Sequence, residues 1–267
     1  MQPIASMPPE TARSVRFAFC DIDDTLTTAG RLPGAAYQAL EDLDRAGIAV
    51  VPVTGRPAGW CDMIARVWPV AGVVGENGAF YYAYDRQARR MIRSFHPDVA
   101  PYISDSNRFD RIIDRIRAEV PGAALSADQS FRIADLAVDF CEDVPRLADQ
   151  DIARIKQIFM EEGAIAKISS IHVNGWFGNY DKLSMTRQFA MERLQIRIDE
   201  RNAECIFVGD SPNDAPMFTF FANACGVANV CDFADQMTVT PKWVAQSAGG
   251  SGFREIVSHL LEAHEKG

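Results

Sequence analysis

Short apolar runs alternate with amphipathic stretches along the first part of the chain. The apolar runs have the length of buried strands and lie at residues 15–20, 48–53 and 71–74. Between them, residues 33–46 and 57–67 repeat apolar side chains at helical spacing, and the first of these stretches ends at Gly47. Strands that alternate with helices in this way predict right-handed βαβ units and a parallel sheet.

The pattern changes between residues 80 and 175. Residues 80–84 and 90–95 predict an antiparallel hairpin that turns at residues 85–87. Amphipathic helices and strand-like apolar runs follow, with the helices near residues 109–120 and 148–162 and the runs at residues 133–140 and 165–173. Residues 96–175 are therefore predicted to form an α+β cap that is inserted into the parallel domain.

The parallel rhythm returns after the insertion. A helix begins at Asp181 and Lys182, a buried strand follows at residues 205–208, and closing strands and a last helix are predicted at residues 224–228, 242–244 and 253–263. The predicted fold class is therefore α/β, with a core that comprises residues 15–95 and 176–267 and has helices on both faces of its sheet. Residues 1–14 contain Pro3, Pro8 and Pro9 but no segment of signal-peptide type, so we expect a flexible tail.

Composition narrows the class of protein. The chain has 267 residues, of which 48% are hydrophobic and 24% charged, as expected for a globular protein with a sizeable core. Its net charge of -9 argues against broad contact with nucleic acid or anionic membranes. The cysteines are scattered without a CxxC pair, which favours buried thiols over a disulfide or zinc site. With no apolar stretch long enough to span a bilayer, a cytoplasmic location is predicted.

Candidate chemistry is concentrated where strands end. Asp21, Asp23 and Asp24 follow the first apolar run directly, and neighbouring acids of this kind repel one another unless a cation holds them. Polar residues also follow the other core strands or begin a core helix: Thr54, Gly55, Arg56, Lys182, Asp210, Asn213 and Asp214. Because parallel strands share one carboxyl edge, we expect these groups to converge on a single crevice.

These residue types suit phosphoryl transfer. In our hypothesis Asp21 attacks phosphorus to form an aspartyl-phosphate, and Asp23 protonates the leaving alcohol and later activates water. Thr54, Gly55, Arg56, Lys182 and Asn213 would bind the phosphoryl oxygens or neutralise their charge.

A carboxylate that approaches a phosphate also needs a metal cation. Mg²⁺ is the expected cofactor, with ligands from the Asp21 side chain, the Asp23 main-chain carbonyl and Asp210. Asp214 would hold either a metal-bound water or Lys182. The predicted enzyme is therefore a phosphoric monoester hydrolase.

In order and spacing, these residues resemble the motifs of the haloacid dehalogenase-like phosphatases. The matching segments are Asp21-Ile-Asp-Asp-Thr25, Val53-Thr-Gly-Arg56, Lys182 and Gly209-Asp-Ser-Pro-Asn-Asp214. The resemblance implies a Rossmann-like core, Mg²⁺ and an aspartyl-phosphate intermediate.

The insertion between the second and third motifs, with Glu76-Asn-Gly-Ala79 before it, is similar to the branch with the larger α+β cap. That branch includes sucrose-phosphate and trehalose-phosphate phosphatases and Cof-type hydrolases. One departure is Asp24, where the family more often has Gly.

The cap residues give weaker indications. His172 and Asn174 share one face of a predicted strand and could point toward the substrate, although they could equally face solvent or stabilise a turn. Arg132 could meet a second anion on the substrate. From the resemblance we expect a small phosphorylated metabolite as substrate, in particular a sugar phosphate, and a monomer or homodimer without nucleic-acid or membrane partners.

Two other functions use similar residues. A phospho-acceptor signalling domain would accumulate a stable aspartyl-phosphate, but Asp23, the late acidic turn and the large insertion favour turnover. A phosphosugar mutase would share the first half of the mechanism and return the phosphoryl group to the sugar.

Overall fold

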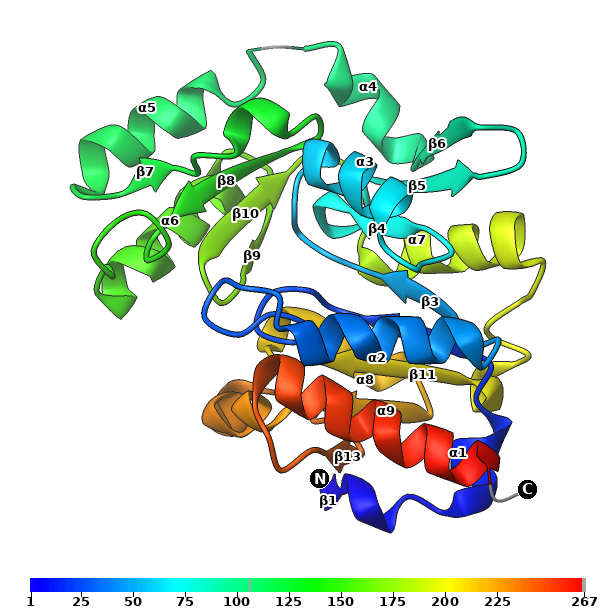
Figure 1. Ribbon diagram of the computed structural model, residues 1–267. Helices are drawn as coiled ribbons and strands as arrows, with labels where there is room; N and C mark the ends of the chain where they lie inside the picture. Colours follow the sequence, from blue (N-terminus) through cyan, green and yellow to red (C-terminus); the bar gives the residue numbers. More distant parts are fainter. Residues whose placement is uncertain (106, 266–267) are drawn as a thin grey trace.

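The computed structural model describes residues 1–105 and 107–265. Its core is a parallel sheet in the order β1-β13-β12-β11-β2-β3 (Figure 1). The strands are β1 Gln2–Pro3, β13 Trp243–Val244, β12 Asn223–Gly226, β11 Cys205–Gly209, β2 Phe17–Cys20 and β3 Ala49–Pro52. The predicted parallel core is thereby confirmed, with β2 and β11 side by side inside the sheet.

Helices cover both faces of this sheet. One face packs against α2 (Gly34–Arg45), α3 (Ala58–Val67) and α9 (Gly249–Glu265), and the other against α7 (Lys182–Phe189) and α8 (Ala215–Phe220). Neighbouring residues of β2 divide between the faces, since Ala18 and Cys20 belong to the first apolar cluster and Phe19 to the second. This alternation explains why the strand is apolar throughout: both of its faces are buried.

A smaller antiparallel sheet extends the core. It joins β4 (Val73–Gly75), β5 (Phe80–Asp85) and β6 (Arg90–Phe95) in that order. The hairpin expected at residues 80–95 is therefore confirmed. A parallel bridge between Val53, which directly follows β3, and Val74 of β4 connects this sheet to the core sheet.

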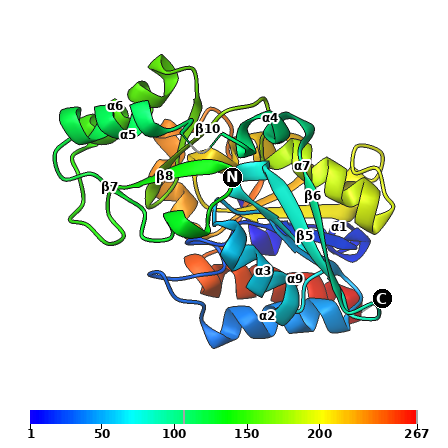
Figure 2. The same cartoon turned by 90° about the horizontal axis from the view of Figure 1, so that it is seen from above.

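The cap is an antiparallel sheet with two longer helices packed against it. Its strand order is β7-β8-β10-β9, and α5 and α6 supply buried isoleucines to its core. The elements are α4 Ala100–Ile103, α5 Asp110–Glu119, β7 Ala124–Leu125, β8 Asp135–Asp139, α6 Asp149–Glu161, β9 Ile165–Ile168 and β10 His172–Trp176. Seen from above, α5 and α6 lie on one side of the molecule and the β5–β6 hairpin on the other (Figure 2).

One expected strand of the cap is in fact two. The apolar run at residues 165–173 is interrupted by a turn in which the Ser169 amide donates to the His172 carbonyl oxygen at 2.8 Å. The Ser169 hydroxyl also accepts from the His172 amide at 3.0 Å. Apolar side chains on both sides of Ser169 and Ser170 made the run resemble a single strand, because β9 and β10 both contribute to the cap core.

The first residues are folded, so the expectation of a flexible tail at residues 1–14 is wrong. Gln2 and Pro3 pair with β13, and α1 (Pro9–Ser14) packs on α9. Ile4, Met7 and Ala12 are buried in the same apolar cluster as α9. Pro8 and Pro9 begin a helix at the position where proline is well tolerated.

Short helical turns connect these elements. They are η1 Ile4–Ser6, η2 Glu76–Gly78, η3 Pro97–Val99, η4 Gln129–Phe131, η5 Ala190–Leu194, η6 Asn202–Glu204, η7 Pro212–Asp214 and η8 Ala228–Gln236. In the part of the chain that the structure describes, no helix has both the length and the apolar character needed to cross a membrane.

Glu76 joins the cap to the core. Its buried carboxylate accepts hydrogen bonds from the Ala134 amide at 2.6 Å and from the Ile133 and Asp135 amides at 3.1 Å in the cap. In the core it accepts from the Ala58 amide at 2.9 Å. Burial and the neighbouring Asp135 raise the pKa of Glu76 to about 7, and its hydrogen bonds to amides of both parts connect the cap to the core.

Candidate active site

Asp21, Asp210 and Asp214 meet at the carboxyl ends of β2 and β11. Asp21 follows β2, Asp210 follows β11, and Asp214 lies at the end of η7. One carboxylate oxygen of each residue lies within 4.8 Å of those of the other two, and all three side chains are buried. The structure thus brings together the acids of the two sequence turns, as the parallel topology predicts.

Lys182 is the cation of this cluster. Its Nζ lies 2.9 Å from Asp21 Oδ1 and 2.8 Å from Asp214 Oδ1. The residue begins α7, whose start is fixed by hydrogen bonds between Asp181 and Ser184. Gly78 allows this helix start to approach the core, because its φ is +105° and a Cβ would lie 2.0 Å from the Asp181 carbonyl oxygen.

Burial and charge shift the protonation of the cluster. Burial raises the pKa of Asp21 to about 7, although Lys182 opposes this shift. The pKa of Asp210 is also raised, by burial and by the neighbouring Asp21 and Asp214. Burial disfavours the Lys182 ammonium, but Asp21 and Asp214 outweigh this and raise its pKa above the ordinary value. Lys182 is therefore charged, whereas burial and mutual repulsion disfavour the ionised forms of Asp21 and Asp210.

A divalent cation fits this donor set. Buried carboxylate oxygens that converge within 4.8 Å are the hard ligands that Mg²⁺ prefers, and added positive charge would favour their ionised forms. Lys182 pairs with Asp21 and Asp214, whereas the carboxylate of Asp210 accepts hydrogen bonds from uncharged groups. The expected ligation by the Asp23 main-chain carbonyl stays a prediction.

Asn229 is a site residue that the sequence did not indicate. Its Nδ2 donates to the Asp24 carbonyl oxygen at 2.8 Å and to Asp210 Oδ2 at 3.3 Å. The Thr25 hydroxyl donates to Asp210 Oδ1 at 3.2 Å. Asn229 thereby ties the first acidic turn to the second, but it lies in η8, outside any recognisable motif.

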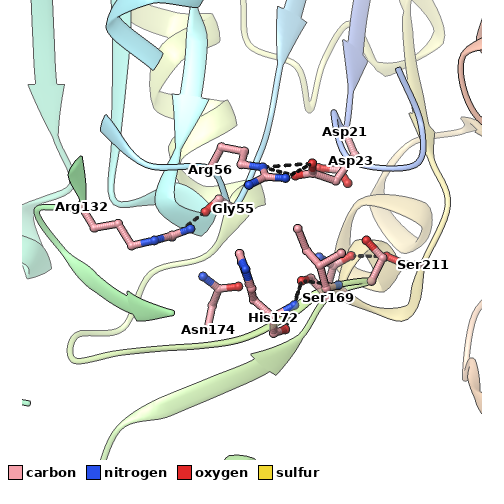
Figure 3. A pocket seen from close by; sticks show the side chains of 12 residues that line it. Asp21, Asp23, Gly55, Arg56, Arg132, Ser169, His172, Asn174 and Ser211 are labelled. Atoms are coloured by element: carbon pink, nitrogen blue, oxygen red, sulfur yellow. Dashed lines mark hydrogen bonds and ion pairs between the residues drawn. The ribbon is translucent and has the colours of Figure 1, made fainter. Parts of the chain in front are cut away.

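Asp23 is held by Arg56 rather than by Lys182. The Arg56 Nε lies 3.0 Å from both carboxylate oxygens of Asp23, and Nη2 lies 2.8 Å from Oδ1. The Arg56 amide donates to the buried Thr54 hydroxyl at 3.0 Å, and its guanidinium lies over the Trp60 ring at 4.4 Å. Figure 3 shows this pair on the core side of the cavity.

The cap supplies the opposite wall. His172 and Asn174 extend from β10 toward the core (Figure 3), and both are buried, so the alternative that they face solvent is wrong. Asn174 Nδ2 donates to Asp135 at 3.0 Å. His172 Nε2 lies 2.9 Å from Glu142 Oε2, although not in hydrogen-bond geometry. His172 and then Arg56 lower the pKa of Glu142 to about 2.

Arg132 does not offer a cation to a second substrate anion. Its guanidinium is paired with Asp128 at 3.0 Å and Asp135 at 2.9 Å, and Nη1 donates to the Gly55 carbonyl oxygen at 2.8 Å. Two carboxylates thus neutralise its charge within the fold. The role considered for Arg132 from the sequence is therefore not supported, and the residue instead connects the cap to the Thr54-Gly55 turn.

Core and cap enclose a small polar cavity of about 20 Å³, which has room for about one water molecule. The turn between β9 and β10, at residues 169–172, forms part of its cap side. Its lining residues are Asp21, Asp23, Gly55, Arg56, Arg132, Ser169, Ser170, Ile171, His172, Asn174, Ser211 and Asn213. The cap is therefore closed over the acidic cluster.

Asp24 lies beside this cavity, in the wall of an adjoining one of about 370 Å³. Its φ of 55° is in the left-handed region, where Gly is favoured and Asp is tolerated. This conformation accounts for the departure from the family pattern. Burial raises the pKa of its carboxyl group.

The sequence is similar to those of known hydrolases. The model of the haloacid dehalogenase-like hydrolase family matches residues 18–112. A phosphoglycolate phosphatase of Methanothrix thermoacetophila is 22% identical over 244 residues, which covers 91% of this chain and 96% of the relative.

Solved structures share the whole fold. A Thermoplasma acidophilum protein has a TM-score of 0.70 at 17% identity, covering 92% of this chain and 98% of its own. The sucrose-phosphatase of Synechocystis, solved with sucrose and phosphate, has a TM-score of 0.61 at 19% identity, covering 93% of this chain and 98% of its own. In its motifs and over residues 18–112, the chain is therefore similar to the haloacid dehalogenase-like hydrolases, and it shares the capped α/β fold of these solved structures.

Proposed function

We propose that the protein is a Mg²⁺-dependent phosphatase that hydrolyses a small phosphorylated metabolite, with sugar phosphates as the expected class. The observation that carries this proposal is the placement of Asp21 between Lys182 and the acids of the second turn, at the floor of a cavity that Asp23 also lines. The hydroxyl, amide and imidazole groups on the cap side suit a polar, uncharged leaving group. Relatives named for phosphoglycolate and sucrose phosphate act on small phosphomonoesters.

In the first step, an oxygen of the Asp21 carboxylate forms a bond to phosphorus while the bond to the leaving oxygen breaks. The Lys182 ammonium donates a hydrogen bond to Asp21 Oδ1, which orients the carboxylate. Its positive charge also offsets the negative charge that opposes the attack. Thr54, the Gly55 amide and Asn213 would donate hydrogen bonds to the phosphoryl oxygens. Asp23 gives its proton to the leaving alkoxide, which departs as an alcohol.

In the second step, Asp23 takes a proton from a water molecule as that water attacks the phosphorus of the aspartyl-phosphate. The Asp21–phosphorus bond breaks, inorganic phosphate leaves, and both carboxyl groups return to their starting states. Asp21, Asp210 and the Asp23 carbonyl would hold the metal, with Asp214 fixing Lys182. A bound Mg²⁺ would supply charge neutralisation for the phosphoryl oxygens.

The test is a panel of phosphorylated metabolites with Mg²⁺, with the Asp21→Asn protein as the blank. We expect release of inorganic phosphate from one substrate class well above that blank. Isomerised sugar phosphate without free phosphate would identify a mutase instead. A stable aspartyl-phosphate without turnover would identify a signalling domain, and either result would overturn the proposal.

Mg²⁺ should also bind and stabilise the protein in the absence of substrate. A ligand at about 100 times its Kd adds about 2.7 kcal/mol to the free energy of unfolding, so thermal melting should shift upward by several degrees. Because the pKa of Asp21 is about 7, Mg²⁺ must displace a proton, and the shift in Tm should grow as the pH rises through that value.

Asp210→Asn should remove most of this Mg²⁺-dependent shift, whereas Asp232→Asn, which alters an exposed acid in η8, should keep it. The measurement is Tm against Mg²⁺ concentration by circular dichroism. An unchanged shift in Asp210→Asn would show that the metal binds elsewhere.

A further inference from the structure

We propose that Glu142 of the cap is a positioning residue that orients Asp23 through Arg56, so that the leaving group is protonated only when the cap is closed. This inference rests on the proposed phosphatase function. It assigns a role to the contact between cap and core that neither the motifs nor the nucleophile requires.

The guanidinium of Arg56 connects the two acids directly. Its Nη2 lies 2.8 Å from Asp23 Oδ1 in the core and 2.8 Å from Glu142 Oε1 in the cap. Nε continues the contact with Asp23 at 3.0 Å, and Nη1 continues the contact with Glu142 at 3.4 Å. The guanidinium is a rigid planar fork, so the acid on one edge fixes the direction in which the other edge points.

Arg56 depends on the cap for this orientation. Its side chain is only 5% exposed, so its charge needs carboxylate partners. Glu142 and Asp128, which lies 3.5 Å from Nη1, both belong to the cap, and only Asp23 belongs to the core. When the cap moves away, the guanidinium therefore loses its contacts with Glu142 and Asp128. Its orientation is then no longer fixed, and neither is that of the Asp23 carboxylate bound to it.

The backbone of Glu142 is fixed in the cap. The buried Asp139 at the end of β8 accepts hydrogen bonds from the amides of Cys141, Glu142 and Asp143 at 2.8–2.9 Å. His172 on β10 lies 2.9 Å from the second oxygen of Glu142. The position of the carboxylate thus reports the position of the cap sheet, and the chain from Glu142 through Arg56 to Asp23 transmits it to the core.

An ion pair that only holds the cap shut would have a different signature. It would affect every substrate alike, because closure precedes all of the chemistry. A residue that positions the proton donor affects substrates according to their need for a proton: an alkoxide leaving group requires protonation, whereas p-nitrophenolate leaves readily without it.

The test compares Glu142→Gln with wild type on glycerol 2-phosphate and on p-nitrophenyl phosphate. The quantity compared is kcat/KM, which reports the steps up to departure of the leaving group, whereas kcat also contains the hydrolysis step that Asp23 serves for every substrate. General acid catalysis contributes about 10²–10⁴-fold, so we expect kcat/KM for glycerol 2-phosphate to fall by roughly 10-fold or more while kcat/KM for p-nitrophenyl phosphate changes by less than about 3-fold. Asp23→Asn should show the same preference, more strongly. Asp143→Asn, which removes the adjacent exposed charge of the same turn, should behave as wild type on both substrates.

Equal losses of kcat/KM on the two substrates would overturn the inference. If the Tm shows that Glu142→Gln is misfolded, Glu142→Asp provides the second variant, because its shorter carboxylate should fail to reach Arg56 and give the same selective loss. A wild-type protein that releases phosphate from neither compound nor from the metabolite panel would overturn the proposed function itself. An active wild type without the selective loss overturns only the role of Glu142.

Discussion

Replacing Asp21 by Asn is expected to lower kcat by at least about 10³-fold on every phosphomonoester the protein accepts. The amide keeps the shape of the side chain but is a far weaker nucleophile toward phosphorus than a carboxylate. Lys182 and the metal would still stabilise the charge of the transition state. Without the attacking carboxylate oxygen, however, the aspartyl-phosphate cannot form and this stabilisation does not restore the rate. The measurement is phosphate release at saturating substrate and Mg²⁺.

The fold should survive this change. Burial raises the pKa of Asp21 to about 7, which means that its charge is unfavourable in the metal-free protein, so Tm in chelator should stay the same or rise. Asp24→Asn is the matched control, because it removes an acid from the same turn and Asn tolerates the left-handed φ of 55°. If Asp21→Asn kept wild-type turnover, or Asp24→Asn lost as much, Asp21 would not be the nucleophile.

Lys182→Met is expected to have the largest effect on stability. The substitution leaves Asp21 and Asp214 buried beside each other without the ammonium that lies within 2.9 Å of both. Removing one partner from a buried ion pair costs about 3–5 kcal/mol, so the free energy of unfolding in chelator should fall by roughly that amount. Turnover should fall by about 10²–10³-fold, because a charge that faces the transferring group is lost.

A second substitution separates the two effects. Lys182→Met combined with Asp214→Asn removes the stranded charge, so a large part of the lost stability should return while turnover stays low. Lys167→Met, at an exposed lysine of β9, should change the unfolding free energy by less than about 0.5 kcal/mol. Urea denaturation measures all three. A double variant no more stable than the single one would show that Lys182 contributes mainly through packing.

The core of the candidate site could be predicted because short-range patterns determine it. Asp21 and Asp210 each follow a buried strand directly, and parallel strands place their carboxyl ends at one edge whatever the length of chain between them. The structure brings Lys182 to the same point by way of α7. Their catalytic roles stay predictions, since convergence establishes proximity rather than chemistry.

The contacts between cap and core could not be predicted in this way. Glu142 and Asn229 make their contacts with residues distant in the chain, and nothing in the sequence around them distinguishes an acid or amide in such a contact from one in a loop. The turn at residues 169–172 was hidden within an apolar run. The N-terminal segment was misjudged because its prolines indicated disorder, whereas the spacing of Ile4 and Met7 against α9 decides its structure.

The folded N-terminal segment also determines at which end the chain can be shortened or fused without promoting aggregation. Gln2 and Pro3 form the outermost strand of the core sheet and cover the edge of β13. β1 and the last turn of α9 lie on the side of the core away from the cap (Figure 1). A chain shortened past Pro3 would leave the edge of β13 available to other molecules, with aggregation as the consequence, while the acidic cluster remained intact. Fusion partners are therefore better attached after α9 than before β1.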